Sequence, residues 1–91
     1  MTDRWAVELT SSARRALEQD LPEPVAWAAY MFLTERLRAN PHRLGGELSG
    51  PYAGRHSAPL GTYRVVYRID EASHTVYVLS IRLRGDVYRV R

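Results

Sequence analysis

Apolar and polar residues in this 91-residue chain alternate with the period of a strand in three segments and recur with the period of a helix in two others. Residues 4–9 alternate polar and apolar side chains, which predicts a short first strand. Thr10 or Ser11 then offers a helix cap, because a hydroxyl there accepts a hydrogen bond from an unpaired backbone N–H. Apolar residues follow at helical spacing as far as Leu21, and Pro22 ends this first helix.

A second helix is predicted from about Pro24 to Ala39, since Asn40 and Pro41 end the helical pattern. Its apolar residues cover more than the single face that packing on a core requires. The stripe comprises Ala26, Ala29, Tyr30, Leu33 and Leu37, and the residues that widen it are Trp27, Met31 and Phe32. The N-terminal part of the chain therefore predicts a strand followed by a two-helix hairpin.

The middle of the chain is rich in residues that interrupt regular structure, and it predicts a loop or an irregular edge strand. These residues are Gly45, Gly46, Gly50, Pro51, Gly54 and Pro59. Regular structure resumes in residues 62–69 and 74–83, which are rich in Val, Ile and Tyr and flank the polar segment 70–73. This pattern predicts a β-hairpin.

The hairpin has one apolar and one basic face, because side chains alternate across a strand. If Asp70 pairs with His74 across a three-residue loop, the apolar sides of both strands coincide and can cover the helices. These sides comprise Tyr63, Val65, Tyr67 and Ile69, then Tyr77, Leu79, Ile81 and Leu83. The same register places Arg64 opposite Ser80, with Arg82 on its diagonal, and a slip of one residue would mix Arg with the core.

Together these elements predict one α+β domain over residues 1–91, with a C-terminal antiparallel sheet that carries the helices on one face. No segment has the apolar length of a signal peptide or of a membrane span, so we expect a cytoplasmic protein without membrane contact. The chain has no Cys, its three His are scattered, and Gly45-Gly46 lacks the Lys-Ser/Thr of a phosphate-binding loop. We therefore expect no metal and no cofactor.

Charge distribution adds the first functional indication. The net charge is +3 and every cation is Arg. Residues 55–91 hold seven Arg against three acids, Asp70, Glu71 and Asp86. A genome rich in G and C would by itself favour Arg, and a single Arg on an open sheet face is usually only solvated. A cluster of Arg on one face repels itself, however, and favours a polyanionic partner such as RNA.

Four segments, in this order and at this chain length, form a specific combination. They are Asn-Pro-His-Arg-Leu-Gly at 40–45, His-Ser-Ala at 56–58, Gly-Thr-Tyr-Arg-Val-Val-Tyr-Arg-Ile-Asp at 61–70 and Arg-Gly-Asp-Val-Tyr-Arg at 84–89. With the strand and helical hairpin before them, they resemble the RelE/ParE toxin superfamily over nearly the whole chain. The resemblance implies a β-α-α-β-β-β fold. It also implies the toxin of a type II toxin–antitoxin system, an endoribonuclease that cuts mRNA in the ribosomal A site and is inhibited by a cognate antitoxin.

The same resemblance implies the residues of a site. Arg64 corresponds to the Arg at the scissile phosphate, Arg82 to a second catalytic Arg, and Tyr88 to the C-terminal Tyr. Arg is nearly always charged, so Arg64 and Arg82 suit phosphate stabilisation, whereas Tyr88 suits proton transfer or stacking on a base. The residues expected to bind RNA around them are Arg55, Arg68, Arg84, Arg89 and His56.

Departures from the family pattern leave two other hypotheses open. Many relatives have Arg-Arg where this chain has Pro59-Leu60, and His where it has Leu83; Glu47 lies only near the catalytic Glu of some relatives. The first change removes phosphate contacts and the second removes a proton shuttle. The alternatives are a ParE-like inhibitor of DNA gyrase and a non-catalytic member that binds antitoxin and RNA.

The surplus apolar surface of the second helix, around Trp27, Tyr30 and Met31, is the expected docking site for an antitoxin. The alternative is that these side chains pack in the core.

Overall fold

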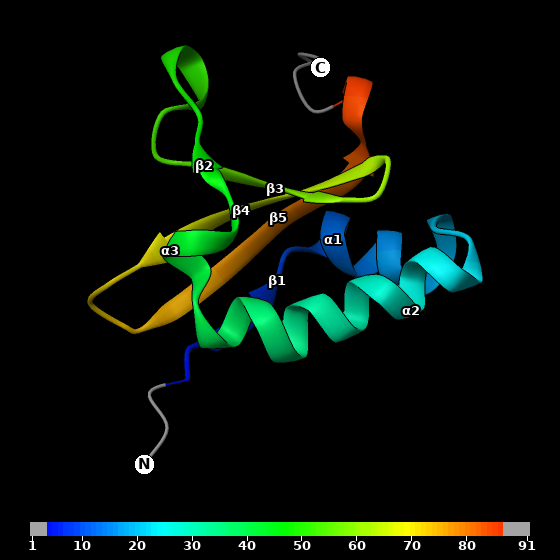
Figure 1. Ribbon diagram of the computed structural model, residues 1–91, viewed down its shortest axis with the longest axis horizontal. Helices are drawn as coiled ribbons and strands as arrows, with labels where there is room; N and C mark the ends of the chain where they lie inside the picture. The colour runs from blue at the N-terminus through cyan, green and yellow to red at the C-terminus, as the bar shows by residue number, and fades with distance from the viewer. Residues whose placement is uncertain (1–3, 87–91) are drawn as a thin grey trace.

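The computed structural model describes residues 4–86, and its centre is a five-stranded sheet (Figure 1). The strand order is β1-β5-β4-β3-β2, in which β1 runs parallel to β5 and the other neighbours are antiparallel. The strands are β1 (Ala6–Leu9), β2 (Gly46–Glu47), β3 (His56–Leu60), β4 (Tyr63–Asp70) and β5 (Thr75–Leu83). The α+β class and the C-terminal antiparallel strands are confirmed, and the first strand joins this sheet at the far edge of β5.

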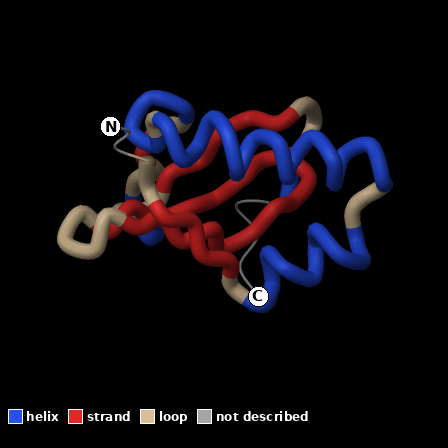
Figure 2. Tube along the Cα trace, turned by 90° about the horizontal axis from the view of Figure 1, so that it is seen from below, coloured by secondary structure: helices blue, strands red, loops and turns tan. Residues whose placement is uncertain are grey.

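The predicted helical hairpin is confirmed, and both of its helices change from α-helical to π-helical geometry along their length. Leu21 and Pro22 join the two helices, and Figure 2 shows this short loop between them. The first helix comprises α1 (Ser11–Arg15) and η1 (Ala16–Asp20), and the second comprises α2 (Glu23–Met31) and η2 (Phe32–Leu37). A short helix α3 (Pro41–Leu44) and two 3₁₀ turns, η3 (Gly50–Tyr52) and η4 (Arg84–Asp86), complete the described chain. None of the described helices is long and apolar enough to cross a membrane.

The core lies between the helical hairpin and one face of the sheet. Its sheet side is formed by Val65, Tyr67, Val76, Val78 and Ile81, and its helix side by Ala13, Ala16, Ala29, Phe32, Leu33 and Leu37. All of these side chains are buried. The opposite face of the sheet, which we call the outer face, points away from α1 and α2, and residues 48–55 and η4 rise on that side (Figure 1).

The register of the β4–β5 hairpin differs from the prediction. Asp70 pairs with Thr75 instead of His74, so the turn is one residue longer. His74 adopts a positive φ of 53° there, and the Ser73 N–H donates to the Asp70 carboxylate at 3.3 Å. A second shift of one residue, between Val66 and Tyr67, adds to this one, so Arg64 lies opposite Arg82, and the predicted pairing of Arg64 with Ser80 was wrong.

An irregularity in the pairing between Val66 and Tyr67 changes which residues of β5 face the core. Tyr67 pairs with Val78 and Val66 pairs with Ser80, which leaves Leu79 as the extra residue of a β-bulge. Before the bulge the even-numbered residues Val76 and Val78 face the core. After the bulge the odd-numbered residue Ile81 faces the core instead. The predicted apolar side of β5 is therefore wrong for Tyr77 and Leu79 and correct for Ile81.

Thr10 joins the bulge to the first helix. Its hydroxyl oxygen accepts a hydrogen bond from the Ala13 N–H at 3.2 Å, which confirms the predicted helix cap. The same hydroxyl donates to the Leu79 carbonyl at 2.8 Å, and the Thr10 N–H donates to the Val78 carbonyl at 3.0 Å. Two successive carbonyls of the bulge are thus bound where β1 ends and α1 begins.

Candidate functional site

An arginine pair is the main feature of the outer face. Arg64 on β4 and Arg82 on β5 are directly opposite in the register, so both side chains leave the sheet on the same side. Arg64 is half-buried and Arg82 is exposed. Arg82 was predicted to lie diagonal to Arg64. The observed register places these two predicted catalytic residues directly opposite each other, and therefore closer together.

The electrostatics of this pair favour an anion. Directly opposite side chains have Cβ atoms roughly 4.5–5.5 Å apart, and like charges there repel. Among the described residues the ion pairs are Arg4–Glu35 and His42–Glu71, so no described carboxylate lies within 4.0 Å of either Arg. A phosphate between the two guanidinium groups would replace this repulsion with charge-assisted hydrogen bonds.

Arg68 extends the basic surface along β4, four residues from Arg64. Its guanidinium carbon lies 4.5 Å from the centroid of the Tyr77 ring, which is its neighbour across the hairpin. Tyr77 was not among the residues predicted for the site, because the expected register placed it in the core. An aromatic ring held beside a cation on an open sheet face can stack on an RNA base. The signal that could have found Tyr77 is its place between Val76 and Val78: if these two residues face the core, Tyr77 faces outward.

The residues that lie across the sheet between Arg64 and Arg68 are uncharged. Val66 lies between Ser57 on β3 and Ser80 on β5, and both Val66 and Ser57 are buried. The Ser57 hydroxyl is buried and has no hydrogen-bond partner. Pro59 lies opposite Arg64, so this position of β3 adjoins the arginine pair without adding a charge.

His56 does not join the arginines. It pairs with Tyr67 and therefore lies on the core side of the sheet, where the two rings stack at 5.4 Å with 17° between their planes. Its Nδ1 atom is buried and has no hydrogen-bond partner. Glu47, opposite His56, accepts a hydrogen bond from the Gly54 N–H at 3.3 Å. This register places the His56 side chain on the side of the sheet opposite to Arg64, and RNA binding by His56 stays a prediction.

The remaining predicted residues flank the outer face or lie beyond the described chain. Arg55 precedes β3 and Arg84 begins η4; both are exposed. Tyr88 and Arg89 lie outside the described residues. Leu83 pairs with Tyr63 and so points to the side of the sheet opposite to Arg82.

No group of three His, Asp or Glu side chains that could hold a metal ion occurs among residues 4–86.

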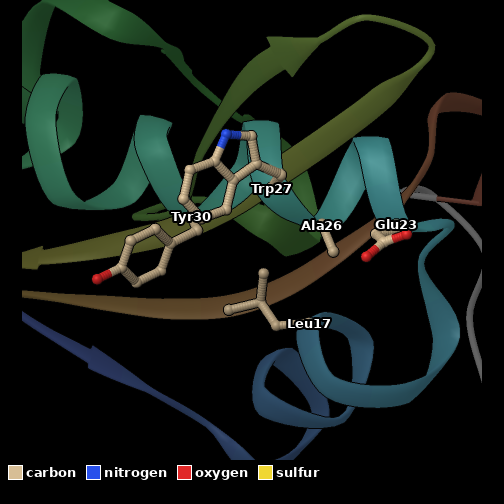
Figure 3. A pocket seen from close by; sticks show the side chains of 5 residues that line it. All are labelled: Leu17, Glu23, Ala26, Trp27 and Tyr30. Atoms are coloured by element: carbon tan, nitrogen blue, oxygen red, sulfur yellow. The ribbon is translucent and has the colours of Figure 1, made fainter.

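An apolar groove lies on the other side of the molecule, between the two long helices. One hollow of about 450 Å³ is lined by Leu17, Glu23, Ala26, Trp27 and Tyr30. Figure 3 shows the Trp27 and Tyr30 side chains projecting from α2 over Leu17. An adjoining hollow of about 360 Å³ shares Leu17 and Tyr30 and continues to Val7 and Leu9 of β1. Trp27 is 65% exposed and Tyr30 51%, so the alternative that they pack in the core was wrong.

Comparison with known proteins gives a consistent result. No family model matches the chain. It is 44% identical over 86 residues to Toxin RelE of Mycobacterium tuberculosis, which covers 94% of this chain and 88% of that protein. It is 40% identical over 85 residues to Toxin RelG of the same organism, covering 93% and 97%. The RelBE2 toxin–antitoxin complex of that organism contains a chain with a TM-score of 0.83 and 38% identity, covering 89% of this chain and 99% of that one.

Proposed function

Because the chain belongs to the RelE toxin family, we propose that it is the toxin of a type II toxin–antitoxin system and cleaves mRNA in the ribosomal A site. The observation that carries this proposal is the Arg64–Arg82 pair, which presents two cations without a described counter-ion on one face of a rigid sheet. The curated relatives are named as toxins, which supports the toxin role.

The chemistry requires three events at one phosphodiester. The 2′-hydroxyl loses its proton and its oxygen attacks phosphorus, the negative charge on the non-bridging oxygens increases, and the bond to the 5′-oxygen breaks as that oxygen gains a proton. The guanidinium group is a hydrogen-bond donor and not a base, so Arg64 and Arg82 suit stabilisation of the phosphorane and not abstraction of the proton. Tyr88, at the C-terminal end of the chain, is the residue we assign to proton transfer.

The phosphate contacts extend beyond the pair. We assign RNA-backbone contacts to Arg68 on β4, to Arg55 and Arg84 beside the outer face, and, from the sequence alone, to Arg89. Arg68 and Tyr77 together offer a cation and a ring, which suits a nucleotide next to the scissile one.

Induced expression tests the proposal. The wild-type chain should arrest growth, and mapped mRNA 5′ ends should show new cuts within codons. Arg64→Ala and Arg82→Ala should each lower the cleavage rate by about 100-fold or more, since each removes a donor to the developing charge. Arg14→Ala is the matched control, because Arg14 is an exposed Arg on α1, on the other side of the sheet. Full arrest by a well-folded Arg64→Ala variant would contradict the proposal.

A ParE-like inhibitor of DNA gyrase is the second candidate function, and Pro59 and Leu83 favour it because they replace a phosphate contact and a proton shuttle. Its signature is growth arrest with an SOS response and intact mRNA. New mRNA ends without DNA damage exclude it.

We further propose that the apolar groove at Trp27 and Tyr30 binds the cognate antitoxin. The groove is exposed and the two rings stack at 5.8 Å, which gives a rigid aromatic surface for an amphipathic helix. Solved relatives have been crystallised as toxin–antitoxin complexes, which supports a partner of this kind.

A further inference from the structure

A buried hydroxyl on the outer face has no hydrogen-bond partner among the described residues. Ser57 pairs with Val66, and the register places both side chains on the outer face, between the positions of Arg64 and Arg68 along β4. Ser57 is 6% exposed, and its hydroxyl oxygen is buried and unpaired. A buried hydroxyl without a partner lowers the stability of a fold, so its presence here needs a physical reason.

Val66 indicates that this part of the outer face is recessed. It is only 5% exposed, yet it does not belong to the hydrophobic core cluster, because its side chain points away from the helices. The groups around Val66 therefore stand higher on this face than Val66 itself. Ser80 on β5 is half-buried and lies on the other side of Val66 from Ser57. We call Ser57, Val66 and Ser80 the serine–valine row.

The chemistry of the serine–valine row suits a ribose. A phosphate favours cations, which the row lacks and which the arginine pair offers beside it. A ribose has apolar C–H groups on its ring, which match Val66, and hydroxyl groups, which match Ser57 because a serine hydroxyl both donates and accepts. The row lies two residues from Arg64 along β4, a distance of about 7 Å. A ribose beside a phosphate bound at the arginine pair would thus lie over this row.

We propose that the Ser57 hydroxyl binds the 2′-hydroxyl of a ribose that adjoins the phosphate at Arg64 and Arg82, with the sugar ring packed on Val66. The hydroxyl oxygen is covered in the free protein. The Ser57 side chain therefore turns about its one torsion, χ1, to another staggered position when RNA binds. This inference rests on the proposed endonuclease function and names the part of the substrate that the row recognises. The unpaired hydroxyl then lowers the stability of the free protein and serves RNA binding.

A double-mutant cycle between protein and RNA tests the inference. The protein carries either Ser57 or Ser57→Ala, both in a Tyr88→Phe background that keeps the RNA intact during the measurement. The mRNA in the ribosomal A site carries ribose or 2′-deoxyribose at one of the two nucleotides that flank the phosphate cut by the wild type. The measured quantity is the Kd for these ribosomes. At one flanking nucleotide, 2′-deoxyribose should weaken binding of the Ser57 protein about fivefold, as expected for one neutral hydrogen bond, and should leave Ser57→Ala unaffected.

Urea unfolding distinguishes this role from a structural one. Ser57→Ala removes a buried hydroxyl that has no described partner, so the unfolding midpoint should stay the same or rise. Ser73→Ala is the matched control, because Ser73 is an exposed serine in the turn between β4 and β5. It should change neither the unfolding midpoint nor the Kd.

Coupling between Ser57 and one 2′-hydroxyl, with the control unchanged, supports the ribose contact. Equal weakening of both proteins by 2′-deoxyribose, or no weakening at either nucleotide, overturns the contact and leaves the endonuclease proposal intact. A lower unfolding midpoint in Ser57→Ala overturns the claim that this hydroxyl is held without a partner. Absence of mRNA cleavage by the wild-type chain overturns the endonuclease proposal together with the inference.

Discussion

Replacement of Tyr67 by Phe removes one atom from the centre of the fold. The Tyr67 side chain is fully buried beside the β-bulge, and its hydroxyl donates to the Pro41 carbonyl at 2.7 Å. This bond ties α3, which follows the long second helix, to the sheet. A buried carbonyl that loses this donor costs about 1–2 kcal/mol, so the free energy of unfolding should fall by that amount at pH 8.

The effect should depend on pH above 10. Burial raises the pKa of the Tyr67 hydroxyl from 10.0 to about 12, and a backbone hydrogen bond with Gly45 lowers it by less. Between these pH values the unfolded chain releases this proton while the folded chain retains it. Rising pH therefore favours unfolding of the wild type, by about 2–3 kcal/mol once pH exceeds both values, and below pH 10 the full stability is present.

Urea unfolding of both proteins, followed by circular dichroism between pH 8 and pH 11.5, tests this reasoning. The other five Tyr residues occur in both chains, so the difference between the two curves isolates Tyr67. Wild type should be the more stable at pH 8, and the two stabilities should converge near about pH 11. A constant stability difference across the range would refute the assignment of a buried, proton-retaining phenol.

Two further predictions concern packing and the partner. Gly45→Ala should lower the free energy of unfolding by about 1–3 kcal/mol, because a Cβ there would lie 2.6 Å from a backbone oxygen of β3; Gly46→Ala has open space and serves as the control in the same urea titration. Trp27→Ala should weaken binding of the cognate antitoxin at least about tenfold in calorimetry, with an unchanged Tm because Trp27 is mostly exposed; equal affinity would move the docking site elsewhere.

Local patterns in the sequence were sufficient for β1, the two long helices, β4 and β5. For residues 41–60 they predicted only a loop or an irregular edge strand, where the structure has α3, β2, η3 and β3. The helix cap at Thr10, the two-helix hairpin and the β4–β5 hairpin each depend on neighbouring residues, and each is confirmed. The placement of Arg64 and Arg82 on one side was also correct. It follows from Val65 and Ile81, which are apolar neighbours that any sheet packed against helices must bury.

Interactions between distant segments decided the rest. Val76 and Val78 face the core because β1 pairs with β5 and continues the apolar surface with Val7 and Leu9, a contact between segments nearly 70 residues apart. If side chains alternated without a break from Val76 and Val78 along β5, Arg82 would point towards the helices. The bulge at Leu79 shifts the alternation by one residue, so Arg82 points to the outer face. A strand pattern specifies which residues share a side only while the alternation is unbroken, and whether it breaks depends on partners that lie far away in the chain.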